Sequence, residues 1–91
     1  MAVVEKVARE FHMRPEELMK ESLKVYLNRK INTIDSELFI LAKRYGVQNV
    51  FELDEVIKEG RFHEEDSFED YFKFDNLEAE RDRIKEYLEQ I

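Results

Sequence analysis

The side chains able to do chemistry in this chain are two histidines, twenty-two carboxylates and a few hydroxyl groups. His63 stands in the run His63-Glu64-Glu65-Asp66, and imidazole and carboxylate groups are ligands for zinc or iron. Neighbouring residues on a helix point in different directions, however, and no second histidine lies three or four residues away to share an ion. We therefore expect a solvated acidic connection here, with no metal site and no cofactor.

Enzymatic chemistry is not predicted elsewhere in the sequence. Carboxylates are so abundant that chance pairs are expected, and the serines Ser22, Ser36 and Ser67 have no nearby histidine to activate them. The two glycines form no phosphate-binding loop. The absence of cysteine removes disulfides, thiol catalysis and thiolate metal sites. We expect a protein that is not an enzyme.

Composition indicates a single helical domain over residues 1–91. Few turn-forming residues and 41% charged residues are typical of a mostly helical protein, and the charge content resembles that of thermophile proteins. No apolar run approaches the ~18 residues needed to span a bilayer. The N-terminal segment carries Glu5 and Glu10 and lacks the apolar stretch of a signal peptide. A cytoplasmic protein without a membrane segment is expected.

One long helix over residues 15–45 is predicted to organise an all-α helical bundle. Pro15 suits the first turn of a helix, and Gly46 suits the left-handed residue that ends one. Polar residues at 32–36 leave a break or kink open. A seven-residue apolar repeat predicts a seam through which the chain forms a homodimer, or which a C-terminal helix covers. The seam residues are Leu27, Ile31, Ile34, Leu38, Leu41 and Tyr45.

Three shorter helices are predicted around the long one. Apolar residues at a period near 3.6 predict a helix from Ala2 to Met13. Asn49, with Glu52 three residues later, predicts the start of a helix over residues 50–59. After a charged loop at 61–66, a C-terminal helix is predicted over about 67–90, with an interruption near residues 75–76 left open.

The C-terminal third combines acidic and aromatic residues. Residues 61–91 hold five basic and eleven acidic residues, a net charge of −6. Aromatic side chains surrounded by acids can anchor a segment in a groove with a basic rim. Alternatively the rings fill the core, as we expect for two of the four. The predicted contacts to a basic protein partner are Phe68, Tyr71, Phe72, Phe74 and Asp70.

A nucleic-acid interface is the alternative function. Clustered cations are enough to contact phosphates, and four basic residues lie in or beside the first half of the long helix: Arg14, Lys20, Lys24 and Lys30. Glu17 and Glu21 lie among them and weaken the positive field. Charge pairs on a solvated helix face explain the same pattern.

The segment over residues 4–31 resembles the helical half of ribbon-helix-helix regulators. The matching positions are Val7, Phe11, Pro15, Leu18, Ser22, Leu23 and Leu27. The strand with which those regulators read DNA has no counterpart before residue 2. The remainder, with AKRYGV, FELDEVIKEG and SFEDYFKFDNLEAE, is similar to small archaeal antitoxin-like proteins of toxin–antitoxin pairs. This resemblance implies a non-enzymatic, dimeric antitoxin-like protein with a toxin-like partner.

Overall fold

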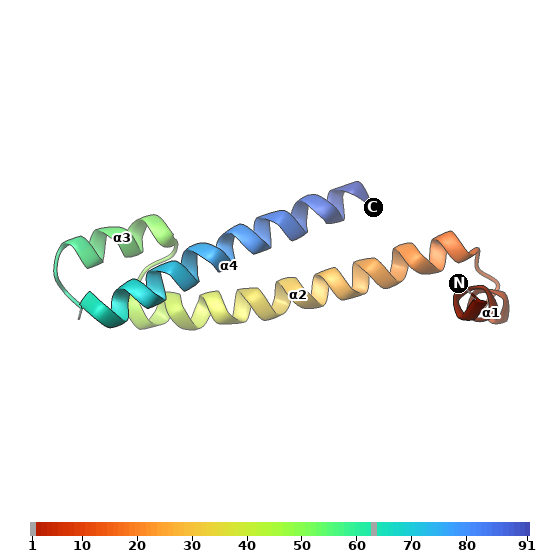
Figure 1. Cartoon of the computed structure of the whole chain (residues 1–91), viewed down its shortest axis with the longest axis horizontal. Helices are drawn as coiled ribbons and strands as arrows, with labels where there is room; N and C mark the ends of the chain where they lie inside the picture. The colour runs from red at the N-terminus through yellow and green to blue at the C-terminus, as the bar shows by residue number, and fades with distance from the viewer. Residues whose placement is uncertain (1, 63) are drawn as a thin grey trace.

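The computed structural model describes residues 2–62 and 64–91, which form four α-helices and no strand (Figure 1). The all-α prediction is confirmed. The helices are α1 (Ala2–Glu10), α2 (Pro15–Tyr45), α3 (Val50–Lys58) and α4 (Glu64–Gln90).

Helix α2 has the predicted boundaries. Pro15 lies in its first turn, and Gly46 ends it in the left-handed region with φ of 67°. The Gly46 N–H donates a hydrogen bond to the Ala42 carbonyl, which satisfies one of the free carbonyls of the last turn. The helix continues without a break through residues 32–36. The Ser36 hydroxyl donates to the Asn32 carbonyl at 2.9 Å, so this polar group is satisfied along the helix itself.

Two other predicted boundaries need correction. Helix α1 ends at Glu10, before the predicted Met13, and His12 turns the chain with a positive φ of 56°. Helix α4 begins at Glu64, so the predicted loop over residues 61–66 is too long. Acidic residues are favourable in a first helical turn, where backbone N–H groups are unpaired. Helix α4 also continues through residues 75–76 without the interruption that the sequence left open.

The core lies where α4 runs antiparallel to α2 and α3 packs beside them (Figure 1). Leu53 of α3 and Phe74 of α4 are its most deeply buried large side chains. Four α2 residues face them and belong to the same buried cluster: Ile34, Leu38, Leu41 and Tyr45. Val47, in the connection before α3, closes this end of the core.

The molecule is elongated, with extents of 60 × 19 × 18 Å. Helix α2 projects beyond the C-terminal end of α4, and α1 packs against this projecting part (Figure 1). We call residues 2–24, which are α1 and the first turns of α2, the N-terminal arm. We call the rest of α2 together with α3 and α4 the body. Every surface described below lies on one of these two parts.

Candidate protein interaction surfaces

The predicted dimer seam is largely covered within one chain. Four of its residues are buried in the core beside α4, namely Ile34, Leu38, Leu41 and Tyr45. Leu27 and Ile31 are half-buried and pack against the same cluster. A homodimer through the seam stays a prediction, and in this structure α4 would have to move before a second copy could reach the buried four residues.

The four aromatic residues of α4 divide into buried and exposed rings. Phe74 is 1% exposed and belongs to the core, so its prediction as a partner contact is wrong for this structure. Tyr71 is half-buried against the core. Phe68 and Phe72 are 45% and 61% exposed, and their spacing of four residues places them on one side of α4. The sequence could not assign these rings to core or surface, because the side of α4 that meets α2 and α3 is set by the tertiary fold.

Exposed carboxylates flank the two outward rings. Glu69 and Asp75 lie three residues before and after Phe72, which makes them its neighbours on the helix surface. Tyr71 meets the Phe72 ring edge-on, with centroids 5.6 Å apart, and so supports it from the core side. We call Phe68, Phe72, Glu69 and Asp75 the α4 aromatic face.

Asp70 lies on another side of α4 and is engaged within the chain. Its Oδ2 accepts a hydrogen bond from Arg44 Nη1 at 2.9 Å and another from the Tyr45 hydroxyl. Burial, followed by the hydrogen bond to Asp70, raises the pKa of Tyr45 to about 12. Burial alone favours the neutral acid at Asp70, but the hydrogen bonds from Tyr45 and Arg44 lower its pKa below the ordinary value. Asp70 therefore fastens α4 to α2.

The basic residues of the nucleic-acid alternative do not form one strip. Arg14 Nε pairs with Glu17 Oε1 at 2.6 Å. Lys20 and Lys24 are exposed and share a side of α2, because they are four residues apart. At 3.6 residues per turn, Lys30 lies about 120° around the helix from Lys24. Nucleic-acid binding through these residues stays a prediction.

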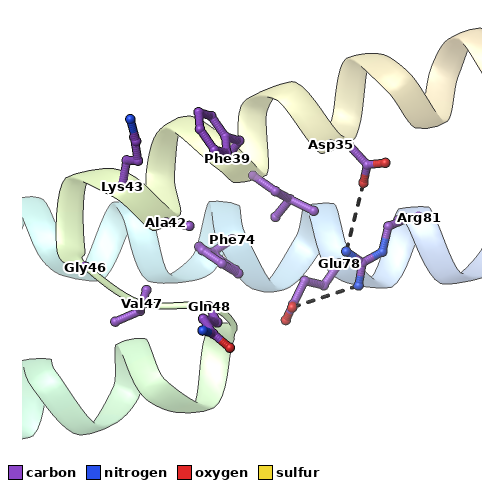
Figure 2. A pocket seen from close by; sticks show the side chains of 11 residues that line it. Asp35, Phe39, Ala42, Lys43, Gly46, Val47, Gln48, Phe74, Glu78 and Arg81 are labelled. Atoms are coloured by element: carbon purple, nitrogen blue, oxygen red, sulfur yellow. Dashed lines mark ion pairs between the residues drawn. The ribbon is translucent and has the colours of Figure 1, made fainter.

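A groove of about 610 Å³ runs between α2, the connection to α3, and α4 (Figure 2). Phe74 lies at its floor, and Arg81 lies at one end between Asp35 and Glu78. Arg81 approaches a carboxylate oxygen of each at 4.0 Å, so its positive charge is already surrounded by acids. The groove holds no nucleophile–base pair among its lining residues.

The arm carries an apolar surface that the sequence did not single out as a site. Five large side chains on it are 38–70% exposed: Val3, Val7, Phe11, Met19 and Leu23. Val3 and Val7 lie four residues apart on α1, and Phe11 follows four residues later in the turn after it. Met19 and Leu23 lie four residues apart on α2. Four of the five line a groove of about 450 Å³ between the two helices. We call these five residues the arm face. Their helical period was visible in the sequence, but their exposure was not.

The part of the chain that the structure describes shows neither a candidate metal site nor a candidate membrane-spanning helix. The predicted acidic connection is centred on His63, which lies outside the described residues. Elsewhere, no cluster of three or more histidines or carboxylates is placed to hold a metal ion. None of the described helices combines the length and the apolar character needed to cross a bilayer.

Comparisons with known proteins place the whole chain in one family. The model of the Uncharacterized protein MJ0235 family matches residues 1–91. No curated protein and no solved structure matches the chain. These comparisons give no support to the resemblance to ribbon-helix-helix regulators or to antitoxins.

Proposed function

The chain belongs to the Uncharacterized protein MJ0235 family, and we propose that it is a non-enzymatic interaction protein that binds a basic protein partner with the α4 aromatic face. The observation that carries the proposal is the pair Phe68 and Phe72, which remain 45% and 61% exposed on one side of a helix rich in carboxylates. Monomeric proteins rarely leave large apolar side chains grouped on the surface without a role in binding.

Aromatic side chains supply the affinity in this proposal. Large rings at the centre of an interface are common hot spots, because they exclude water over a wide area at a small cost in side-chain entropy. Phe72 is held from one side by Tyr71, so part of its orientation is fixed before any partner binds.

Charge supplies the preference for a basic partner. Residues 61–91 carry a net charge of −6, and exposed Glu69 and Asp75 border Phe72. Complementary charge accelerates encounter and disfavours acidic competitors. The resemblance to antitoxins gives the finer form of the proposal, in which the basic partner is a toxin encoded by an adjacent gene.

Photo-crosslinking at Phe72 tests the proposal. A benzophenone amino acid replaces Phe72 in one variant and Tyr87 in a matched control, since Tyr87 is 56% exposed and lies on the same helix. After irradiation in the cells that make the protein, we expect one adduct of defined mass from position 72, and a basic protein in it. The same adducts from both positions, or none from position 72, would count against the α4 aromatic face.

Titration of that partner then measures the face directly. We expect Phe72→Ala to weaken binding by about 30-fold or more, as truncation of a hot-spot ring does, and Tyr87→Ala to leave it within about twofold. Affinity should also fall as salt is added, because the attraction is partly electrostatic. Equal losses from both substitutions would show that Phe72 is not an anchor.

A further inference from the structure

We propose that the N-terminal arm is a self-association surface, on which a second copy of this chain packs arm against arm. The arm face presents five large apolar side chains that are 38–70% exposed, while four apolar α2 residues of the body are buried: Ile34, Leu38, Leu41 and Tyr45. Helix α2 extends beyond the C-terminal end of α4 (Figure 1). Met19 and Leu23, in the first turns of α2, remain about half exposed. This inference concerns a different surface from the α4 aromatic face and does not rest on it.

The arm cannot shelter this surface by itself. Helix α1 has nine residues, and Ala8 is the one buried residue among them. An isolated helix shorter than about 12–15 residues is marginal in water, so α1 depends on contacts made by its apolar side. Its contacts with α2 leave Val3 and Phe11 about 70% exposed. A second apolar surface would complete the packing that these residues lack.

Charge favours a second copy as the occupant. Residues 1–24 contain five basic and five acidic residues, so the arm is neutral while the rest of the chain carries the whole net charge of −7. Two copies that met through their bodies would bring like charges together, whereas two arms meet without net repulsion. Oppositely charged residues alternate along the arm, as in Glu5-Lys6 and Lys20-Glu21, and a two-fold arrangement can pair them.

The size of the arm face is also adequate for a modest dimer. A specific interface buries at least about 1,000 Å² in total, or roughly 500 Å² from each copy. A single fully buried aromatic ring contributes about 150–250 Å². The arm face holds one phenylalanine, three aliphatic side chains and one methionine. An interface near this lower limit predicts association that depends on protein concentration.

Sedimentation equilibrium of the full chain tests the inference. Leu23→Glu places a charge on the arm face, and Ile40→Glu places the same charge at a similarly exposed position of α2 in the body, at 49% and 58% exposure respectively. We expect the unsubstituted chain and Ile40→Glu to show dimers, and Leu23→Glu to shift the dissociation constant at least tenfold. A monomer at all concentrations, or equal effects of both substitutions, would overturn the proposal.

Energy transfer between copies gives a second readout that leaves the arm face unchanged. The sequence contains no cysteine, so Glu16→Cys in the arm and Glu59→Cys beyond α3 each carry one dye. Residue 59 is the C-cap residue of α3, and α3 lies at the opposite end of the 60 Å molecule from α1 (Figure 1). Arm-to-arm packing predicts strong transfer between labels at 16 and none between labels at 59. Transfer that is equal at both positions, or stronger at 59, would exclude this arrangement.

Discussion

Along α2 the apolar stripe changes its surroundings as it passes from the arm into the body. In the body, Ile34, Leu38 and Leu41 are buried beneath α4 and α3. In the arm, Met19 and Leu23 continue the stripe and remain half exposed beside α1. Both parts carry apolar residues at helical spacing, and the difference in their burial follows from their neighbours. A helical period therefore identifies which side of a helix is apolar, and tertiary contacts decide whether that side is buried.

The strongest way to test this contrast is to make the same substitution in both parts. Phe74→Ala removes a ring that is 1% exposed in the body and should lower the free energy of unfolding by about 3–5 kcal/mol. Phe11→Ala removes a ring that is 68% exposed in the arm and should cost less than about 1 kcal/mol in the monomer. Urea titration followed by circular dichroism measures both values.

These measurements should be made at a protein concentration too low for self-association, because a dimer would stabilise the arm. Equal losses for the two substitutions would mean that the arm and the body are buried alike in solution. The contrast drawn from the structure would then be wrong.

Local sequence signals predicted α2 well, because its ends depend on residues nearby. Pro15 and Gly46 fix its two ends through backbone geometry, so no knowledge of the rest of the fold was needed. The sequence predicts the start of α4 too late, because the acidic run Glu64, Glu65 and Asp66 also suits a charged loop. A run of acids after Gly60 was a usable signal for a first helical turn.

The division of the α4 rings could not be obtained in the same way. Phe72 and Phe74 are two residues apart in an acidic helix whose aromatic residues cover several sides. Their burial depends on where α2 and α3 lie around α4, which is a property of the whole fold. The open arm face has the same origin, since its exposure reflects the absence of a third helix at that end of the described chain.

A second comparison concerns the two nine-residue helices, α1 in the arm and α3 in the body. Helix α3 is capped by Asn49, whose side chain accepts a hydrogen bond from the Glu52 N–H at 2.9 Å. The Glu52 carboxylate in turn accepts from the Gln48 N–H at 2.8 Å. We expect Asn49→Ala to lower the free energy of unfolding by about 1 kcal/mol, because it leaves a helix N–H without its partner. Thermal unfolding followed by circular dichroism measures the loss.

Ser36→Ala is the matched control for this cap. The Ser36 hydroxyl also bonds to backbone, but it does so inside α2, where the helix already satisfies its own N–H groups. Alanine is a better helix former than serine, so this change should be neutral or slightly stabilising. A loss at Ser36 as large as that at Asn49 would show that the cap has no special role.

A third comparison concerns the polar link between Asp70 of α4 and Arg44 and Tyr45 of α2. The arm face, which consists of apolar side chains, has no such link. Tyr45→Phe removes the hydroxyl that donates to Asp70 and should lower the free energy of unfolding by about 0.5–1.5 kcal/mol near neutral pH.

The same link predicts a dependence on pH. The pKa of Tyr45 is raised to about 12 from 10, so the folded state favours the neutral phenol. This contribution is complete below pH 10 and is lost as the pH rises toward 12. Urea midpoints measured across this range should therefore fall more steeply for the unsubstituted chain and for the exposed control Tyr87→Phe than for Tyr45→Phe. Parallel curves for all three would mean that the link between Tyr45 and Asp70 does not contribute to stability, because lysine ionisation in the same range affects all three proteins alike.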